Sequence, residues 1–190
     1  MSLLFIADKT FQKQDYRKQA LQKAEYDNCA FVNCDFMNSY LSSVSFTDCE
    51  FTDCNLSNVK AKEAAFKNVT FNTCKMVGFP FFECDPFLLE LAFNDCNLSL
   101  ASFYLLNLKQ TAFNTCDLQE ADFTQTNLTE ATFHNSDLSK AIFEQSNLEK
   151  ADFTKATNYT IHPEKNRIKG ATFDKDGLLG LLTMYHINIQ

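Results

Sequence analysis

Large apolar residues recur at every fifth position along most of this chain, and no other feature limits its possible folds as strongly. In residues 116–153 they alternate between Leu and Phe, at Leu118, Phe123, Leu128, Phe133, Leu138, Phe143, Leu148 and Phe153. An amphipathic helix repeats its apolar residues about every 3.6 positions, and a half-buried strand about every 2. A period of five fits neither, so each five-residue unit is expected to be a structural element of its own.

The period runs in two registers joined by a short break. The first register extends from Phe11 to Phe81 and the second from Phe93 to Phe153. The step from Phe81 to Phe93 is 12 residues instead of 10, so two residues are inserted within a break at about 79–92. We expect the insertion to alter one unit without ending the repeat.

The position two residues before each large residue is the second repeated feature. It is nearly always small, and all eight cysteines occupy it: Cys29, Cys34, Cys49, Cys54, Cys74, Cys84, Cys96 and Cys116. Cys in a buried slot acts as a compact hydrophobe. The spacing matches no zinc pattern, so we predict free thiols that fill the core, with no metal and no cofactor.

Five-residue units of this kind gain a core only by stacking. Each unit offers one large and one small side chain to the interior and three to the outside, so a single unit buries almost nothing. Cys34, Cys54 and Cys74 are 20 residues apart; Cys96 follows after 22 and Cys116 after 20 more. These steps indicate a solenoid with four units in each coil.

The pattern Ala/Cys–Asp/Asn–Leu/Phe–x–x resembles the pentapeptide-repeat family over residues ~9–157. The resemblance implies an all-β, right-handed quadrilateral β-helix of about seven to eight coils, stacked at the spacing of β-strands, roughly 4.8 Å. We assign residues 1–174 to this β-helix, with an irregular segment at about 154–168.

Residues 175–190 depart from the repeat. We expect a short helix at about 177–185, capped by Asp174 or Asp176, and then a short strand. The segment is strongly apolar, with Leu178, Leu179, Leu181, Leu182, Tyr185, Ile187 and Ile189. It resembles the C-terminal helix and strand of the quinolone-resistance (Qnr) pentapeptide proteins, which implies a homodimer joined tail to tail. The alternative is a cap on a monomer.

Apolar residues also gather around the break, at positions that the register makes outward. They are Phe82, Phe87, Leu88, Leu100, Tyr104 and Leu105, with Leu89 beside them. Either they cover one another in a packed bulge, or they form an exposed contact patch. We expect the packed bulge.

The formal net charge is −7, which argues against direct binding of nucleic acid. It is compatible with occupying a site built for nucleic acid. One predicted column reads Asp15, Asp35, Asn55, Lys75, Asn97, Asp117 and Asp137. The candidate acidic contact surface is Asp15, Asp35, Asp95, Asp117, Glu120, Asp122, Glu130, Asp137, Glu144 and Glu149. The alternative is an ordinary solvated face.

Nothing in the sequence indicates catalysis. The three histidines, His134, His162 and His186, are scattered, and no nucleotide, hydrolase or metalloprotease motif is present. We expect a packed solenoid without a pocket that could shift pKa values, and so no enzyme. We also expect no signal peptide, no membrane span and a cytoplasmic location.

The resemblance to the Qnr proteins implies a function. It implies a non-enzymatic DNA mimic that binds DNA gyrase or topoisomerase IV and protects it from fluoroquinolones. Many Qnr proteins carry two projecting loops that are important for protection, whereas the break here adds two residues. The alternative is a general protein-interaction scaffold with no topoisomerase target.

Overall fold

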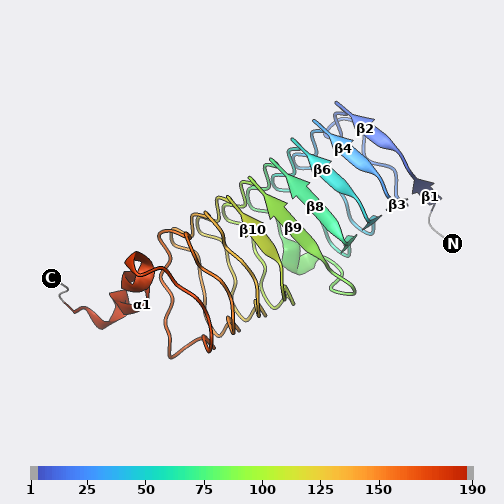
Figure 1. The fold of residues 1–190 in the computed structure, drawn as a ribbon. Helices are drawn as coiled ribbons and strands as arrows, with labels where there is room; N and C mark the ends of the chain where they lie inside the picture. The colour runs from blue at the N-terminus through green and yellow to red at the C-terminus, as the bar shows by residue number, and fades with distance from the viewer. Residues whose placement is uncertain (1–3, 188–190) are drawn as a thin grey trace.

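Ten short strands, each parallel to its neighbours, wind along the described part of the chain into two sheets (Figure 1). The computed structural model describes residues 4–187. One sheet has the order β1-β3-β5-β7 and the other β10-β9-β8-β6-β4-β2. The bounds are β1 Leu4–Ala7, β2 Thr10–Gln12, β3 Ala24–Asp27, β4 Ala30–Val32, β5 Ser45–Thr47, β6 Glu50–Thr52, β7 Ala65–Lys67, β8 Val69–Asn72, β9 Leu91–Asn94 and β10 Ala112–Asn114.

Successive coils stack in register. Phe11 pairs with Phe31 and Phe31 with Phe51, a step of 20 residues, whereas Phe71 pairs with Phe93. Single bridges such as that between residues 152 and 172 continue the stack beyond β10. The predicted quadrilateral β-helix is therefore confirmed. Its coil count differs slightly from the expected seven to eight, because the longer sheet has six strands and only single bridges extend it.

Stacked aromatic rings fill the interior. Along the column from Phe11 to Phe173, successive ring centroids lie between 4.7 and 5.4 Å apart, and the rings are 3° to 21° from parallel. Rings of adjacent columns meet edge to face, as Phe103 and Phe113 do at 82°. Offset stacks and edge-to-face pairs add ~0.5–1.5 kcal/mol each beyond the area they bury. The core is thus held by contacts between coils.

Left-handed backbone forms the corners of the coils. The second residue after most interior large residues has a positive φ, for example Asn58 at 54° and Gln125 at 56°. Its N–H donates to a carbonyl of the next coil, as from Asn58 to Val77 at 3.0 Å. This conformation costs a non-glycine residue ~1–3 kcal/mol, and less for Asn or Asp. The ladder bonds offset that cost.

The two inserted residues bulge out of one corner. A short 3-10 helix, η1 (Phe81–Glu83), precedes them, and Asp85 still bridges to Ala65. The ladder resumes where the Glu90 N–H donates to the Phe66 carbonyl at 3.1 Å. Residues 86–89 form the loop that leaves the coil outline just before β9 (Figure 1). The break alters one coil and leaves the stacking of its neighbours intact.

The C-terminal segment forms a short helix in three pieces, η2 (Asp176–Leu178), α1 (Leu179–Leu182) and η3 (Thr183–Tyr185). Gly177 and Gly180 lie flush against Tyr159, because a Cβ on Gly180 would come within 2.2 Å of the Tyr159 carbonyl oxygen. The Ile161 N–H donates to the Gly180 carbonyl at 3.0 Å. Close glycine packing therefore attaches the helix to the last coil.

The predicted cap of this helix is wrong. No side chain caps η2, and the Asp174 carboxylate instead accepts a hydrogen bond from the Lys155 N–H. The predicted final strand involves Ile189, which lies outside the described residues. Within residues 4–187, no helix has the length and apolar character needed to cross a membrane.

The aromatic stack predicts that replacing an interior phenylalanine destabilises the protein far more than replacing an outward one. Phe93→Ala removes a fully buried ring and should lower the free energy of unfolding by ~3–5 kcal/mol. Phe82→Ala, at an exposed ring, should change it by less than ~0.5 kcal/mol. Urea unfolding followed by circular dichroism measures both, and similar losses in the two variants would contradict the assigned core.

Candidate interaction surfaces

The predicted acidic column forms. Single parallel bridges join residues 15, 35, 55, 75, 97, 117 and 137 in that order, one on each successive coil. The Asp and Asn side chains of the column share one contact: each accepts a hydrogen bond from the N–H two residues later, as Asp35 does from Met37 at 3.0 Å. Lys75 is the exception. The column is therefore first of all a set of turn-stabilising side chains.

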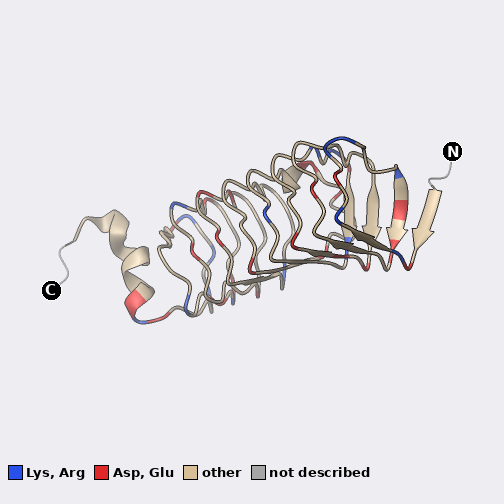
Figure 2. Cartoon of the chain, turned by 90° about the horizontal axis from the view of Figure 1, so that it is seen from above, with Lys and Arg blue, Asp and Glu red and all other residues tan. Residues whose placement is uncertain are grey.

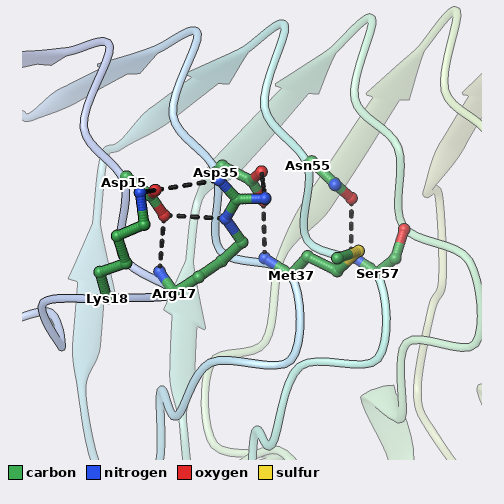
Figure 3. A network of polar contacts seen from close by, with 7 residues as sticks. All are labelled: Asp15, Arg17, Lys18, Asp35, Met37, Asn55 and Ser57. Carbon is green, nitrogen blue, oxygen red and sulfur yellow. Dashed lines mark hydrogen bonds and ion pairs between the residues drawn. The ribbon is translucent and has the colours of Figure 1, made fainter.

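Its N-terminal end is neutralised by two basic residues (Figure 3). Arg17 contacts Asp15 at 2.8 Å and Asp35 at 3.1 Å, and Lys18 contacts Asp15 at 3.2 Å. The hydrogen bond from Arg17 holds the pKa of Asp15 well below its usual range. Asp15 and Asp35 are thus brought together, but they present little net negative charge.

The C-terminal end of the column keeps its charge. The Asp117 carboxylate accepts hydrogen bonds from the Gln119 N–H at 3.0 Å and from the Asn97 amide at 3.2 Å. Burial raises the pKa of Asp137, but hydrogen bonds from Asn158 and Ser139 outweigh it, and the net effect lowers that pKa. Uncharged hydrogen-bond donors hold both carboxylates in place without neutralising their negative charge.

Most of the other predicted acids pair with a cation on the following coil. The pairs are Glu120–Lys140, Glu130–Lys150, Glu144–Lys165 and Glu149–Arg167, with N–O distances of 3.0 to 3.4 Å. Asp95 and Asp122 have no ion pair within residues 4–187. Basic positions are interspersed among the more numerous acidic ones along the backbone (Figure 2). The acids do not merge into one stripe.

The apolar residues at the break are exposed, so the expected packed bulge is wrong. Phe82, Phe87, Leu88, Leu100, Tyr104 and Leu105 each leave between 37% and 66% of their surface accessible. Phe87 has one charged neighbour, the Lys67 ammonium at 5.9 Å from its ring centroid. Leu89 does turn inward and packs against the core.

Three of these residues also carry an unfavourable backbone conformation. Leu88, Leu100 and Leu105 have φ values of 57°, 60° and 62°. Elsewhere in the described chain, the non-glycine residues with positive φ are polar or charged. Leucine at such a corner combines backbone strain with exposed apolar surface.

An open groove lies beside the break, where we expected no pocket. Its volume is about 630 Å³, and Lys67, Asn68, Leu88, Glu90 and Lys109 are among the residues that line it. The two-residue insertion was the available signal, because the extra loop supplies Leu88 and Leu89 to the lining of the groove. None of the three histidines lines the groove.

The exposed side of the C-terminal helix is apolar. Leu178, Leu179, Tyr185 and Ile187 are 43% to 55% exposed, whereas Leu181 and Leu182 are half-buried and Leu181 packs against the core. The helix thus covers the last coil with one side and offers apolar side chains on the other. Ile189 lies outside the described residues.

The cysteines occupy the predicted small slot. All eight are free and buried, and within residues 4–187 no cluster of potential metal ligands occurs. The thiols bond to carbonyls of the preceding coil, as Cys54 does to Phe31 at 3.3 Å. Ser146 takes the same place with its hydroxyl, at 2.8 Å from the Phe123 carbonyl. Burial raises the pKa of Cys49 to about 12, so its thiol stays neutral.

Sequence reasoning missed several surface residues. Tyr40 and Ile142 are 69% and 49% exposed, and both lie one residue before an interior large residue. Arg17, which joins two coils, was also missed. The five-residue period was the signal for Tyr40 and Ile142, since it marks both positions as outward.

Family models for pentapeptide repeats match the chain in overlapping segments. The pentapeptide repeat region matches residues 44–122, and the model of eight pentapeptide repeats matches 21–58 and 116–154, so the matches run without a gap from 21 to 154. The chain belongs to the pentapeptide-repeat proteins. No curated protein matches the chain in a sequence search.

The fold is shared with a solved pentapeptide-repeat structure. A trypsin-treated variant of QnrB1, a plasmid-mediated fluoroquinolone resistance protein, aligns with a TM-score of 0.64 and 15% identity, and all of each chain is covered. HetL, a pentapeptide-repeat protein involved in heterocyst differentiation regulation in the cyanobacterium Nostoc sp., has a TM-score of 0.43 and 14% identity, and 90% of this chain and 87% of HetL are covered. At these identities the likeness concerns the fold.

The burial of all eight cysteines predicts that thiol reagents react poorly with the native protein. Because the thiols are buried and Cys49, Cys84 and Cys116 have raised pKa values, fewer than about one thiol per chain should react with Ellman's reagent at pH 8. All eight should react in denaturant. Rapid reaction of several thiols in the folded protein would show that the slot is open to solvent.

Proposed function

We propose that this pentapeptide-repeat protein is non-enzymatic and acts in the cytoplasm by binding a type II topoisomerase in place of DNA. The target would be DNA gyrase or topoisomerase IV. Two facts support the proposal: the resemblance to the Qnr proteins, and the shared fold with QnrB1, which is itself a plasmid-mediated fluoroquinolone resistance protein. The observation that carries it furthest is the distribution of charge along the rod.

The negative charge is concentrated in the second half of the solenoid. Residues 95–152 contain nine acids and three lysines, a net charge of −6, against −7 for the whole chain. Duplex DNA carries a phosphate about every 3.4 Å along each strand, and stacked coils repeat at ~4.8 Å. A rod with carboxylates on successive coils therefore offers a target a spacing of negative charge comparable to that of a DNA strand.

Asp117 and Asp137 are the carboxylates that best fit this role. They lie on adjacent coils of one column and are held by backbone N–H groups and amides rather than by cations. Asp95 and Asp122 add unpaired charge on neighbouring columns. The four Glu residues paired with Lys or Arg would contribute less, because exposed ion pairs are already largely compensated.

Supercoiling by purified gyrase tests the proposal directly. Increasing amounts of the protein should inhibit supercoiling, or should restore it in the presence of ciprofloxacin. Rescue from the drug would extend the proposal to fluoroquinolone resistance. No effect at a large molar excess over gyrase and topoisomerase IV from the matching organism would refute topoisomerase binding.

Charge reversal identifies the contact surface. Asp117→Lys with Asp137→Lys should weaken binding to gyrase at least about tenfold, because two attractive contacts become repulsive. Binding of the parent protein should also weaken as salt increases. Lys13→Glu, at an exposed position of the N-terminal half, is the matched control and should leave binding unchanged.

A second candidate function is an interaction scaffold, which the exposed apolar residues at the break favour. Binding through such a surface should be nearly insensitive to salt, and the reversal of Asp117 and Asp137 should spare it. Phe87→Ala with Leu88→Asn should abolish it. Asn at position 88 suits the left-handed corner, so the change removes apolar surface without adding strain.

We further propose that the C-terminal helix joins two copies tail to tail. Leu179→Asp places a charge on the exposed apolar side of the helix and should shift the protein from dimer to monomer. Sedimentation velocity over a range of concentrations measures the shift. Lys13→Glu, an exposed charge change far from the tail in the N-terminal half, is the control. An unchanged mass for Leu179→Asp would exclude the tail interface.

A further inference from the structure

We propose that one lateral face of the solenoid pairs with the same face of a second copy, with the two rods antiparallel. This face, here named the Tyr40–Ile142 face, carries the column Tyr40, Lys60, Pro80, Ser102, Asp122 and Ile142. Bridges join 40 to 60, 80 to 102, 102 to 122, and 122 to 142, so the column follows the rod axis. This face is distinct from the tail and from the Asp117–Asp137 column, and of the acids proposed to face a topoisomerase it contains Asp122.

The residues of this column, read from one end, are complementary to the same residues read from the other end. Read along the chain, its ends are aromatic and aliphatic, its second position is basic and its fifth is acidic. An antiparallel copy places Tyr40 opposite Ile142, Lys60 opposite Asp122, and Pro80 opposite Ser102. An isologous interface requires this reciprocity, because each contact occurs twice about the two-fold axis. The axis would cross the face between positions 80 and 102.

The middle of the face is apolar. Phe82 and Tyr104 follow Pro80 and Ser102 by two residues, so they lie side by side next to the proposed axis, and both are exposed. A two-fold axis across the face brings Phe82 of each copy opposite Tyr104 of the other. Leu100 and Leu105 border this centre from the two corners, where their strained backbone presents them outward. A few residues near the centre of an interface, often Tyr or Trp, usually supply most of its binding energy.

The charges that flank this centre are not neutralised within the described part of the chain, although Asp122 accepts a hydrogen bond from the Ser102 hydroxyl at 3.4 Å. Lys60 and Asp122 form no ion pair in the described part of the chain, although seven other contacts between charged groups occur there. Asp122 is held in place by the Thr124 N–H at 2.9 Å. The two unpaired charges are opposite in sign and equally distant in coils from the axis, one on each side. Charge complementarity therefore identifies a second copy as the occupant.

The outer ends add two more apolar contacts. Tyr40 and Ile142 each lie two coils beyond the central pair of positions, in opposite directions. Five rungs at ~4.8 Å separate them, so the face spans roughly 24 Å. Tyr40 and Ile142 each lie one residue before an interior large residue. Many other five-residue units have a polar or charged residue at that place. Their symmetrical placement about the same axis is a second, independent sign of self-association.

A charge-swap cycle tests the pairing. All variants are made in the Leu179→Asp background, so that the tail cannot contribute, and the dimer dissociation constant is measured by sedimentation equilibrium. Lys60→Glu and Asp122→Lys should each raise it at least about tenfold, since each creates two like-charge contacts. The double variant should return to within about threefold of the parent. Lys13→Glu is the control and should have no effect.

Site-specific cross-linking tests the same geometry even if Asp122→Lys disturbs folding. Tyr40→Cys combined with Ile142→Cys should form disulfide-linked dimers on mild oxidation, and peptide mapping should show the 40–142 link between chains. Neither single variant should form disulfide-linked dimers. In an antiparallel pair, position 40 of one chain lies far from position 40 of the other, and the same holds for position 142. The eight native thiols are buried, so the introduced ones should react first.

Three results would overturn the proposal. The first is a monomer at every accessible concentration in the Leu179→Asp background. The second is a dimer whose stability does not respond to Lys60→Glu or Asp122→Lys. The third is a cross-link between two copies of position 40, which would require parallel rods. None of these results bears on gyrase inhibition, so failure here is distinguishable from failure of topoisomerase binding.

Discussion

The stacking of one coil on the next at a fixed distance is the constraint on which this structure depends. Parallel strands repeat at roughly 4.8 Å, and the interior phenylalanines of one column repeat at 4.7 to 5.4 Å. Backbone hydrogen bonding and ring stacking thus favour the same spacing. A coil of different length must put its extra residues outside, as residues 86–89 do, because Phe71 and Phe93 remain stacked at 5.4 Å.

This constraint explains what could be predicted from the sequence. The small cysteine slot and the column from Asp15 to Asp137 follow from backbone periodicity alone, and both were predicted. The pairs Glu120–Lys140 and Glu130–Lys150 are also 20 residues apart and could have been found in the same way. The contacts of Arg17 with two coils could not have been predicted, because they depend on the conformation of its side chain.

The surface at the break was harder to predict for a different reason. The sequence shows that two residues are inserted, but several corners of the coil could absorb them. Whether Phe87 and Leu88 turn inward or outward then depends on which corner opens, and here Leu89 takes the inward place. The positive φ of Leu88 follows from the same choice. Local geometry, not hydrophobicity, decided the exposure of these residues.

The regular coil also determines how much charge the rod can carry. Each outward residue lies beside its equivalents on the coils before and after, so a Glu next to a Lys on the following coil is largely compensated. The charge of an Asp next to an Asn is not compensated, because the amide donates a hydrogen bond without adding charge, as Asn97 does to Asp117. Amide neighbours can therefore hold carboxylates in order at full charge. The acidity available to a partner depends less on the number of acids than on which residue lies one coil away.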